Sequence, residues 1–186
     1  MSIIKFNQTS LNSWVNTIIS KQMVFGVQAL RHQFQFAPLD KAEDLQLDYD
    51  VTILPPKKFF LPQRESLLEF TAAGEYKGTT ENEPFVLFGV HPYDVVAISQ
   101  MDKVFSADNY DVHYMSRRRS ATIVACDPQN ASAHGFAGVM NTSSVQDGCD
   151  ILLTKIDQYY LAEAKTEKGE LLLADLPGGA PAGEEE

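Results

Sequence analysis

The chain has little cysteine and none of the short motifs that mark several common enzyme chemistries. Its 186 residues include only two cysteines, Cys126 and Cys149, and neither has a close cysteine partner. This spacing excludes a disulfide framework and a zinc or thioredoxin-type motif, so we expect two half-buried structural thiols. A P-loop, a GxGxxG turn, an HExxH helix and a nucleophile elbow are also absent, so the usual signs of nucleotide, zinc or hydrolase chemistry are missing.

Long apolar runs and positive charge are scarce as well. No run of about 18 apolar residues could span a membrane, and the first six residues lack the apolar core and cleavage site of a secretory signal. We therefore expect a cytoplasmic protein without membrane insertion. Acidic residues outnumber basic ones by 25 to 15, which gives a formal net charge of −10. Nucleic acids and anionic membranes attract basic surfaces, so neither is an expected partner.

What the chain does have is enough apolar material for one core, since 44% of its residues are hydrophobic. Apolar residues recur at helical spacing over 11–19, and Thr9 or Ser10 can cap this helix. Two extended runs follow at 23–27 and 33–38, and their pattern is typical of an edge hairpin.

The middle of the chain contains two apolar runs of strand length, 84–90 and 121–126. Such runs are typical of strands that are buried on both faces of a sheet. Helical patterns at 95–105 and 110–119 lie between them, so a β-α-β unit with parallel strands is the economical topology. A further hairpin is predicted at 150–164. The sequence therefore predicts an α/β fold: a mixed sheet with central parallel βαβ strands flanked by helices, plus a C-terminal β-hairpin.

Proline and glycine punctuate the remaining segments. Pro62 suits the first turn of a helix that continues through Phe70, and Gly169 predicts a turn. We expect a single α/β domain over residues 1–173 and a flexible acidic tail over 174–186.

The segment 127–146 is rich in Asn, Ser, Ala, Gly and Thr and has little apolar periodicity. Loops of this length inside a compact domain are often functional. Packing explains this part of the chain least well, so we expect it to contribute to a functional face.

Several blocks in fixed order resemble one protein family. They are PPKKFFLPQRE at 55–65, LFGVHP at 87–92, MSRR at 115–118, TIVA at 122–125 and DILLT at 150–154. These blocks resemble the N-terminal domain of an iron-sulfur, electron-transfer subunit that anaerobic sulfite reductase and sulfhydrogenase share. In sulfhydrogenase it is the beta subunit. Members usually continue into a ferredoxin-like domain whose CxxCxxC motifs bind two four-iron clusters. The present sequence contains no such motif.

The resemblance implies that the cluster cysteines of the N-terminal domain are replaced in this chain. At the positions where the family typically has cysteine stand Tyr93, Pro128, Gly135 and Ala137. A phenol, a proline ring, a hydrogen and a methyl group cannot replace the thiolates that a four-iron cluster requires. Since the surrounding family pattern is retained, we expect a preserved fold with no metal and no cofactor of its own, and we expect Tyr93 to fill the vacated space.

The candidate functional residues fall into two groups. The cofactor-binding candidates are Lys57, Lys58, Arg64 and His91; the interface candidates are His91, Asp94, Arg117, Arg118, Asp127, His134 and Phe136. The strand end before His91 is where open α/β sheets usually bind ligands. Structural explanations compete with each role: solvated lysines, arginines favoured at a helix C-terminus, and a neutral histidine satisfied by backbone carbonyls.

These inferences favour a noncatalytic, cluster-less subunit of a cytoplasmic multi-subunit redox complex in an anaerobe, of the hydrogenase, sulfite reductase or heterodisulfide-reductase type. It would dock partner subunits that carry 4Fe-4S clusters or flavin. One alternative is a flavin- or nucleotide-binding oxidoreductase domain, and bound FAD or FMN would make that protein yellow. Another is the front half of a split iron-sulfur subunit, which would copurify with a CxxCxxC-bearing partner.

Overall fold

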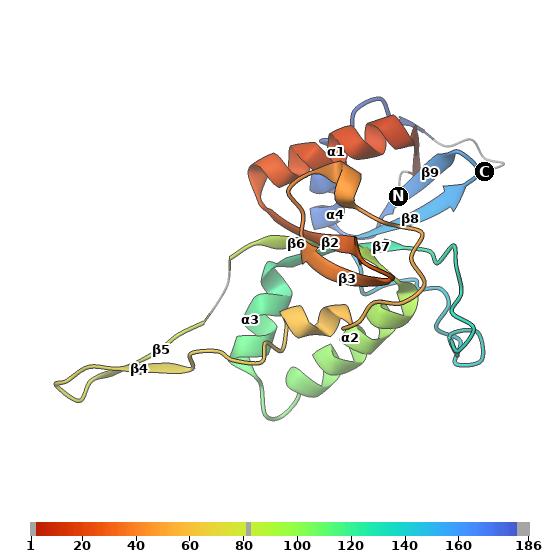
Figure 1. Cartoon of the computed structure of the whole chain (residues 1–186). Coiled ribbons are helices and arrows are strands. Elements are labelled where there is room, and N and C mark those ends of the chain that lie inside the picture. The colour runs from red at the N-terminus through yellow and green to blue at the C-terminus, as the bar shows by residue number, and fades with distance from the viewer. Residues whose placement is uncertain (1–2, 81–82, 182–186) are drawn as a thin grey trace.

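The computed structural model describes residues 3–80 and 83–181, and one mixed sheet forms its centre (Figure 1). Its eight strands follow the order β10-β1-β9-β8-β7-β6-β2-β3. They are β1 (Ile3–Asn7), β2 (Met23–Leu30), β3 (Gln33–Pro38), β6 (Phe85–Val90), β7 (Ala121–Cys126), β8 (Ile151–Ile156), β9 (Tyr159–Ala164) and β10 (Ala180–Pro181). The pairs from β2 through β6 and β7 to β8 are parallel, and the outer pairs are antiparallel. The predicted fold class and both predicted hairpins are confirmed.

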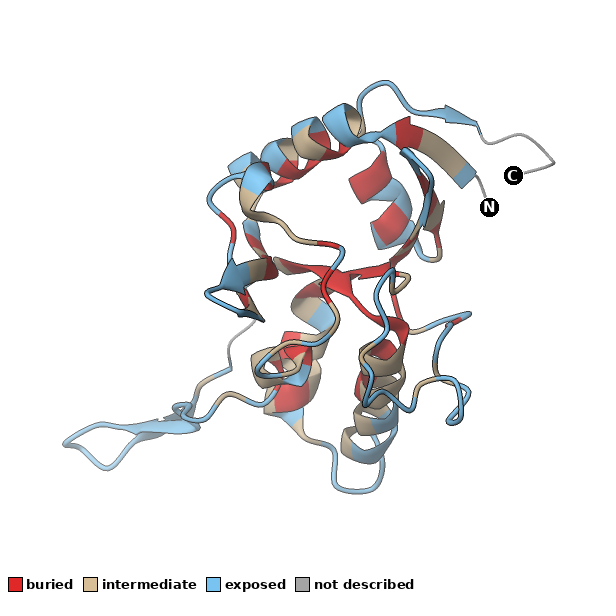
Figure 2. Ribbon diagram, turned by 45° about the vertical axis from the view of Figure 1, so that its right-hand side comes forward, coloured by how far each residue is buried: buried red, intermediate tan, exposed pale blue. Residues whose placement is uncertain are grey.

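Helices cover both faces of this sheet (Figure 2). The four helices are α1 (Gln8–Lys21), α2 (Pro92–Phe105), α3 (Val112–Ser120) and α4 (Glu167–Leu173), and the two short 3-10 turns are η1 (Ala42–Asp44) and η2 (Pro56–Phe59). One core includes Trp14 of α1 and Leu172 of α4, whereas the other includes Ile98 of α2 and Tyr114 of α3. Because β6 and β7 lie between the two cores, both of their faces are buried, which explains their continuous apolar runs.

The start of α1 differs from the prediction. Its N-cap is Asn7, the last residue of β1, and the Asn7 side chain accepts a hydrogen bond from the Ser10 N–H at 3.0 Å. A cap at Thr9 or Ser10 was therefore wrong, because the strand leads directly into the helix and its own last residue supplies the capping oxygen.

The turn predicted at Gly169 is also wrong, because Gly169 lies inside α4. A Cβ at this position would come within 2.0 Å of the Asp150 carbonyl oxygen. The glycine is explained by this close approach of α4 to the chain before β8, and not by a turn conformation.

The helix predicted from Pro62 to Phe70 is not present. Instead the chain enters an antiparallel hairpin of β4 (Leu68–Phe70) and β5 (Tyr76–Gly78), which projects from the body of the molecule (Figure 1). A short apolar run fits the periods of a helix and of a strand equally well, and here 68–70 pairs with the strand that follows the turn at Gly74. All residues of the two hairpin strands are exposed.

The C-terminal part of the described chain stays close to the body. Ala180 and Pro181 pair with β1, and Leu176 packs against the core beneath α1. The rest of the predicted tail, 182–186, lies outside the described residues, so its flexibility stays a prediction. Among the helices of the described chain, none is long and apolar enough to cross a membrane.

Candidate functional site

The parallel strands β6 and β7 end at the same edge of the sheet, so the residues that follow them, His91 and Asp127, emerge side by side. A β-bulge at Gly89 shifts the register of β6 just before this edge. Gly89 has a φ of 85°, and a Cβ there would come within 2.8 Å of Leu47. Glycine is therefore needed for the bulge that precedes His91.

His91 is fully buried in a cluster of aromatic rings. Its ring stacks on Tyr49, with 3.9 Å between centroids and 1° between planes. Its Nδ1 lies 2.6 Å from the Tyr93 hydroxyl, which itself donates to the Asp50 carbonyl oxygen at 3.1 Å. Since the single phenol proton goes to Asp50, His91 donates from Nδ1 and leaves Nε2 as the acceptor.

The predicted satisfaction of His91 by backbone carbonyls is wrong. Nδ1 is paired with a phenol oxygen, and Nε2 has no hydrogen-bond partner among the residues that the structure describes. The imidazole ring is held by stacking on Tyr49 and by the Nδ1 hydrogen bond, and Nε2 is buried without a second hydrogen bond.

Burial controls the protonation of these groups. Desolvation lowers the pKa of His91 to about 4, and a nearby carboxylate only partly opposes this, so the imidazole is neutral at pH 7. Desolvation also raises the pKa of Tyr49 and of Tyr93. At the start of α2, desolvation raises the pKa of Asp94 to about 6, with Lys57 opposing the rise. The cluster thus consists of neutral hydrogen-bonding groups beside two carboxyls, those of Asp50 and Asp94.

A cavity of about 500 Å³ adjoins this cluster. Its lining includes Tyr93 after β6 and Pro128, Gly135 and Ala137 from the loop after β7. These are the four positions at which the family resemblance places cysteine, and the fold brings all four to one space. Within the described chain, the lining contains no thiol, lysine or arginine, and Asp50 is its one carboxylate.

The long loop after β7 is tethered at its start and exposed in its middle. Asp127 accepts a hydrogen bond from the Thr154 hydroxyl at 2.6 Å. Further along, His134 is exposed, and Phe136 and Met140 are 71% and 69% exposed although both line the cavity. The loop therefore presents apolar side chains at the mouth of the cavity.

Two of the predicted interface residues lie on α3 and are engaged within the chain. Arg117 is buried, donates from Nε to the Phe60 carbonyl oxygen at 3.0 Å and pairs with Glu65. Arg118 pairs with Asp102 at 2.8 Å. These contacts hold α3 against η2 and α2, which argues against a docking role for either guanidinium group.

The three predicted basic cofactor residues do not line the cavity. Lys58 donates to the Phe36 carbonyl oxygen at 2.8 Å, and burial lowers its pKa. The positive charge of Lys57, in η2, opposes the rise in the pKa of Asp94. Arg64 is exposed and precedes the β4–β5 hairpin.

Sequence reasoning missed Tyr49 and Asp50, which hold His91 and Tyr93 in place. Their one local signal is the alternation of apolar and polar residues over 45–50. That pattern indicates an extended segment but does not reveal which strand end it lies against.

Both cysteines are free and buried, deeper than the half-buried thiols predicted. Cys126 belongs to the core under α1 and Cys149 to the core under α2. Burial raises the pKa of the Cys126 thiol to about 12 and that of Cys149 to about 11. Protonated thiols on two sides of the sheet are poor ligands. Over 3–80 and 83–181, no group of three or more His, Cys, Asp or Glu side chains is placed to hold a metal ion.

Comparison with curated proteins finds similarity to the sulfhydrogenase 2 subunit beta of Pyrococcus furiosus. The two sequences are 30% identical over 171 residues, which make up 91% of this chain and 50% of that protein. The chain thus spans about half the length of the curated relative it matches. No protein-family model matches the chain, and no solved structure matches it.

Proposed function

The chain is a distant homologue of a sulfhydrogenase beta subunit, and from this premise we propose that it is one component of a multi-subunit redox complex. In this proposal the chain is noncatalytic and cluster-less, and it docks subunits that transfer electrons. We further propose that the complex is a hydrogenase, a sulfite reductase or a heterodisulfide reductase, and that it is cytoplasmic.

One observation carries the proposal: Tyr93, Pro128, Gly135 and Ala137 line a single cavity although they come from two separate segments. Three of these residues lie on the loop after β7, and the fold adds Tyr93 from the start of α2, far away in the sequence. This shared cavity supports the proposal that the four positions correspond to cluster ligands of the family, because a four-iron core needs its thiolates within one shell. The side chains now present offer no thiolate, so the residues of this cavity do not fit a four-iron cluster.

The surface around the cavity has the properties of a docking face. Phe136, Val139 and Met140 are exposed by 71%, 87% and 69% on one loop. Clustered exposed apolar side chains often mark protein interaction sites. A docked domain of this kind can fix the distances between electron carriers without carrying charge itself.

The β4–β5 hairpin is a second apolar feature that suits a chain working in an assembly. Leu68, Phe70 and Tyr76 share one face of the ribbon, because Phe70 is paired with Tyr76, and they are 49%, 73% and 74% exposed. The opposite face has the cross-strand pair Glu69 and Lys77. An isolated two-stranded hairpin is marginally stable in water, so contact with a partner would stabilise this one.

A flavin- or nucleotide-binding domain is the second candidate, and the position of the cavity is what favours it. The cavity lies at the carboxyl ends of parallel strands, where α/β folds bind nucleotides, and its volume of about 500 Å³ suits a cofactor. Its lining within the described chain nevertheless offers Asp50 and no lysine or arginine for a phosphate. Docking therefore remains the preferred function.

Anaerobic purification of a tagged chain from its native cells tests the proposal. We expect protein without visible absorption, iron, sulfide or flavin, copurifying with subunits that contain CxxCxxC motifs or flavin. A brown protein with stoichiometric iron and sulfide would contradict the cluster-less proposal. A yellow protein with stoichiometric flavin would instead support the second candidate.

A further inference from the structure

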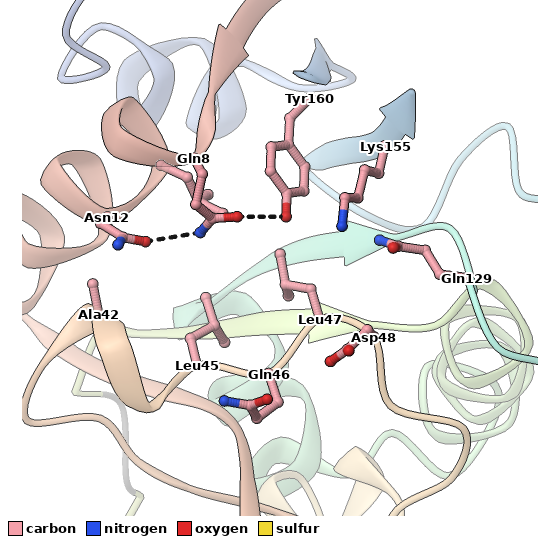
Figure 3. A pocket seen from close by; sticks show the side chains of 11 residues that line it. Gln8, Asn12, Ala42, Leu45, Gln46, Leu47, Asp48, Gln129, Lys155 and Tyr160 are labelled. Atoms are coloured by element: carbon pink, nitrogen blue, oxygen red, sulfur yellow. Dashed lines mark hydrogen bonds between the residues drawn. The ribbon is translucent and has the colours of Figure 1, made fainter. Parts of the chain in front are cut away.

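A second, smaller cavity lies on the α1 side of the same strand ends. It encloses about 210 Å³ between the first turn of α1, the segment 45–48, Gln129 and the β8–β9 hairpin (Figure 3). Neither the docking proposal nor the family resemblance assigns a role to it. Leu11 and Leu47 give it an apolar floor, and most of its other side chains are polar.

A chain of hydrogen bonds holds one wall of this cavity in a fixed orientation. The Tyr160 hydroxyl donates to Gln8 Oε1, and Gln8 Nε2 donates to Asn12 Oδ1, each at 2.9 Å. Burial raises the pKa of Tyr160, which keeps the phenol protonated as the donor. This network fixes the orientation of the Asn12 amide, because its Oδ1 accepts from Gln8.

Other polar groups at the cavity have no hydrogen-bond partner within the described chain. Figure 3 shows the Lys155 ammonium and the Gln129 amide pointing into the same space near the Tyr160 hydroxyl, with the Asp48 carboxylate on the opposite side. Lys155 lies 5.8 Å from the centroid of the Tyr160 ring and forms no ion pair with any described residue. The cavity thus offers a cation and amide donors at one end and an anion at the other.

We propose that this cavity binds a small zwitterionic metabolite of the α-amino acid class. The ligand carboxylate pairs with Lys155 and Gln129, and its ammonium pairs with Asp48. Charge-assisted hydrogen bonds of this kind are stronger than neutral ones, and opposite charges at the two ends match only a ligand that has both. This inference does not depend on the proposed docking function.

The size of the cavity limits the ligand. At about 210 Å³ the cavity is less than half the size of the larger one. A compact amino acid such as serine fits this space, whereas a nucleotide or flavin does not. The exposed position of Lys155 and Asp48 means that water competes for both charges, so the expected affinity is modest.

Isothermal titration calorimetry of the full chain with three probes tests the inference. We expect L-serine to bind with a Kd of about 1 mM. L-lactate lacks the ammonium and ethanolamine lacks the carboxylate, so each should bind about tenfold more weakly. Absence of L-serine binding up to about 20 mM, or equal binding of either single-charge probe, would overturn the proposal.

Variants assign the binding to this cavity. Lys155→Met and Asp48→Asn should each weaken L-serine binding about tenfold, while Asp48→Asn should leave L-lactate binding unchanged. The matched controls are Lys103→Met and Asp108→Asn, whose exposed charges lie elsewhere and should not affect binding. Far-UV circular dichroism checks that all four variants fold. L-serine binding that survives in folded Lys155→Met and Asp48→Asn would place the ligand elsewhere and contradict the assignment.

Discussion

The two cavities at the carboxyl ends of the parallel strands differ in the polarity of the side chains that line them. The larger one, on the α2 side, is lined mainly by small and apolar side chains, and the smaller one, on the α1 side, by amides and charges. Two short segments without helix or strand structure, 48–50 and 128–130, line both of them. Asp48 and Gln129 face the smaller cavity, whereas Asp50 and Pro128 face the larger one.

This arrangement shows how one sheet edge supports two independent sites. Neighbours in sequence contribute to different cavities, since Pro128 lines the larger one and Gln129 the smaller one. The chemistry of one cavity can therefore change without altering the other. Four experiments test how far this independence goes.

The largest effect is expected when cysteine is placed at the four matching positions. A variant with Tyr93→Cys, Pro128→Cys, Gly135→Cys and Ala137→Cys should bind about four iron atoms per chain after anaerobic reconstitution with iron and sulfide. The wild-type chain should bind none. Iron and sulfide analysis with visible absorption spectra measures this, and L-serine binding at the smaller cavity should be unchanged.

The control for this variant has four cysteines at exposed serines outside both cavities. The substituted positions are Ser13, Ser20, Ser106 and Ser144. Equal iron in the two variants would mean that iron binds to any exposed thiols. It would remove the argument that the larger cavity is a former cluster site.

A pH-dependent effect is expected from groups beside the larger cavity. The folded-state pKa of His91 is about 4, below 6.5 in the unfolded chain, so its neutral form contributes stability at pH 7 that is lost as pH falls toward 4. The pKa of Asp94 is raised to about 6, so this carboxyl has the opposite effect, and stability from it is lost as pH rises from about 4 to 6. In the wild-type chain the two effects largely cancel.

Asp94→Asn should expose the His91 contribution. The free energy of unfolding of this variant should fall by up to about 1.4 kcal/mol per pH unit between pH 6.5 and 4, and more steeply than that of the wild type. Urea unfolding at each pH measures both slopes. Identical pH profiles would show that the pKa of Asp94 is not raised in the folded chain. A flat profile of Asp94→Asn between pH 6.5 and 4 would show that the pKa of His91 is not lowered.

A matched pair of Tyr→Phe variants compares the walls of the two cavities. Tyr93→Phe leaves His91 Nδ1 and the Asp50 carbonyl oxygen without their partner, so it should cost about 2 kcal/mol of unfolding free energy. Tyr160→Phe removes only the bond to the exposed Gln8 and should cost about 1 kcal/mol or less. Urea denaturation ranks the two, and a larger loss for Tyr160→Phe would reverse our comparison.

The smallest effect on stability is expected at the mouth of the larger cavity. Phe136→Ser and Met140→Ser should change the free energy of unfolding by no more than about 0.5 kcal/mol, because both side chains are exposed. They should nevertheless reduce copurification of the redox subunits. Val104→Ser is the control, since Val104 is 68% exposed on α2 away from the cavity. Unchanged copurification in all three variants would show that this loop is not the docking face.

Much of the central fold could be predicted from the sequence. The runs that became β6 and β7 are continuously apolar and six residues long, which is the composition and length of a strand buried on both faces. The segment from Pro62 to Phe70 could not be predicted in the same way. Its few apolar residues fit either period, and the hairpin that they form is exposed, so no core selects between the two.

The candidate site could likewise be predicted only in part. The sequence by itself determined which residue types are available, including the four non-sulfur side chains at the matching positions, because composition does not depend on folding. Only the tertiary structure decided that Tyr93 and the loop after β7 share one cavity, and that Tyr49 and Asp50 hold His91 and Tyr93 beside it. These contacts join residues far apart in the chain, and they follow from strand order and register, which local patterns do not specify.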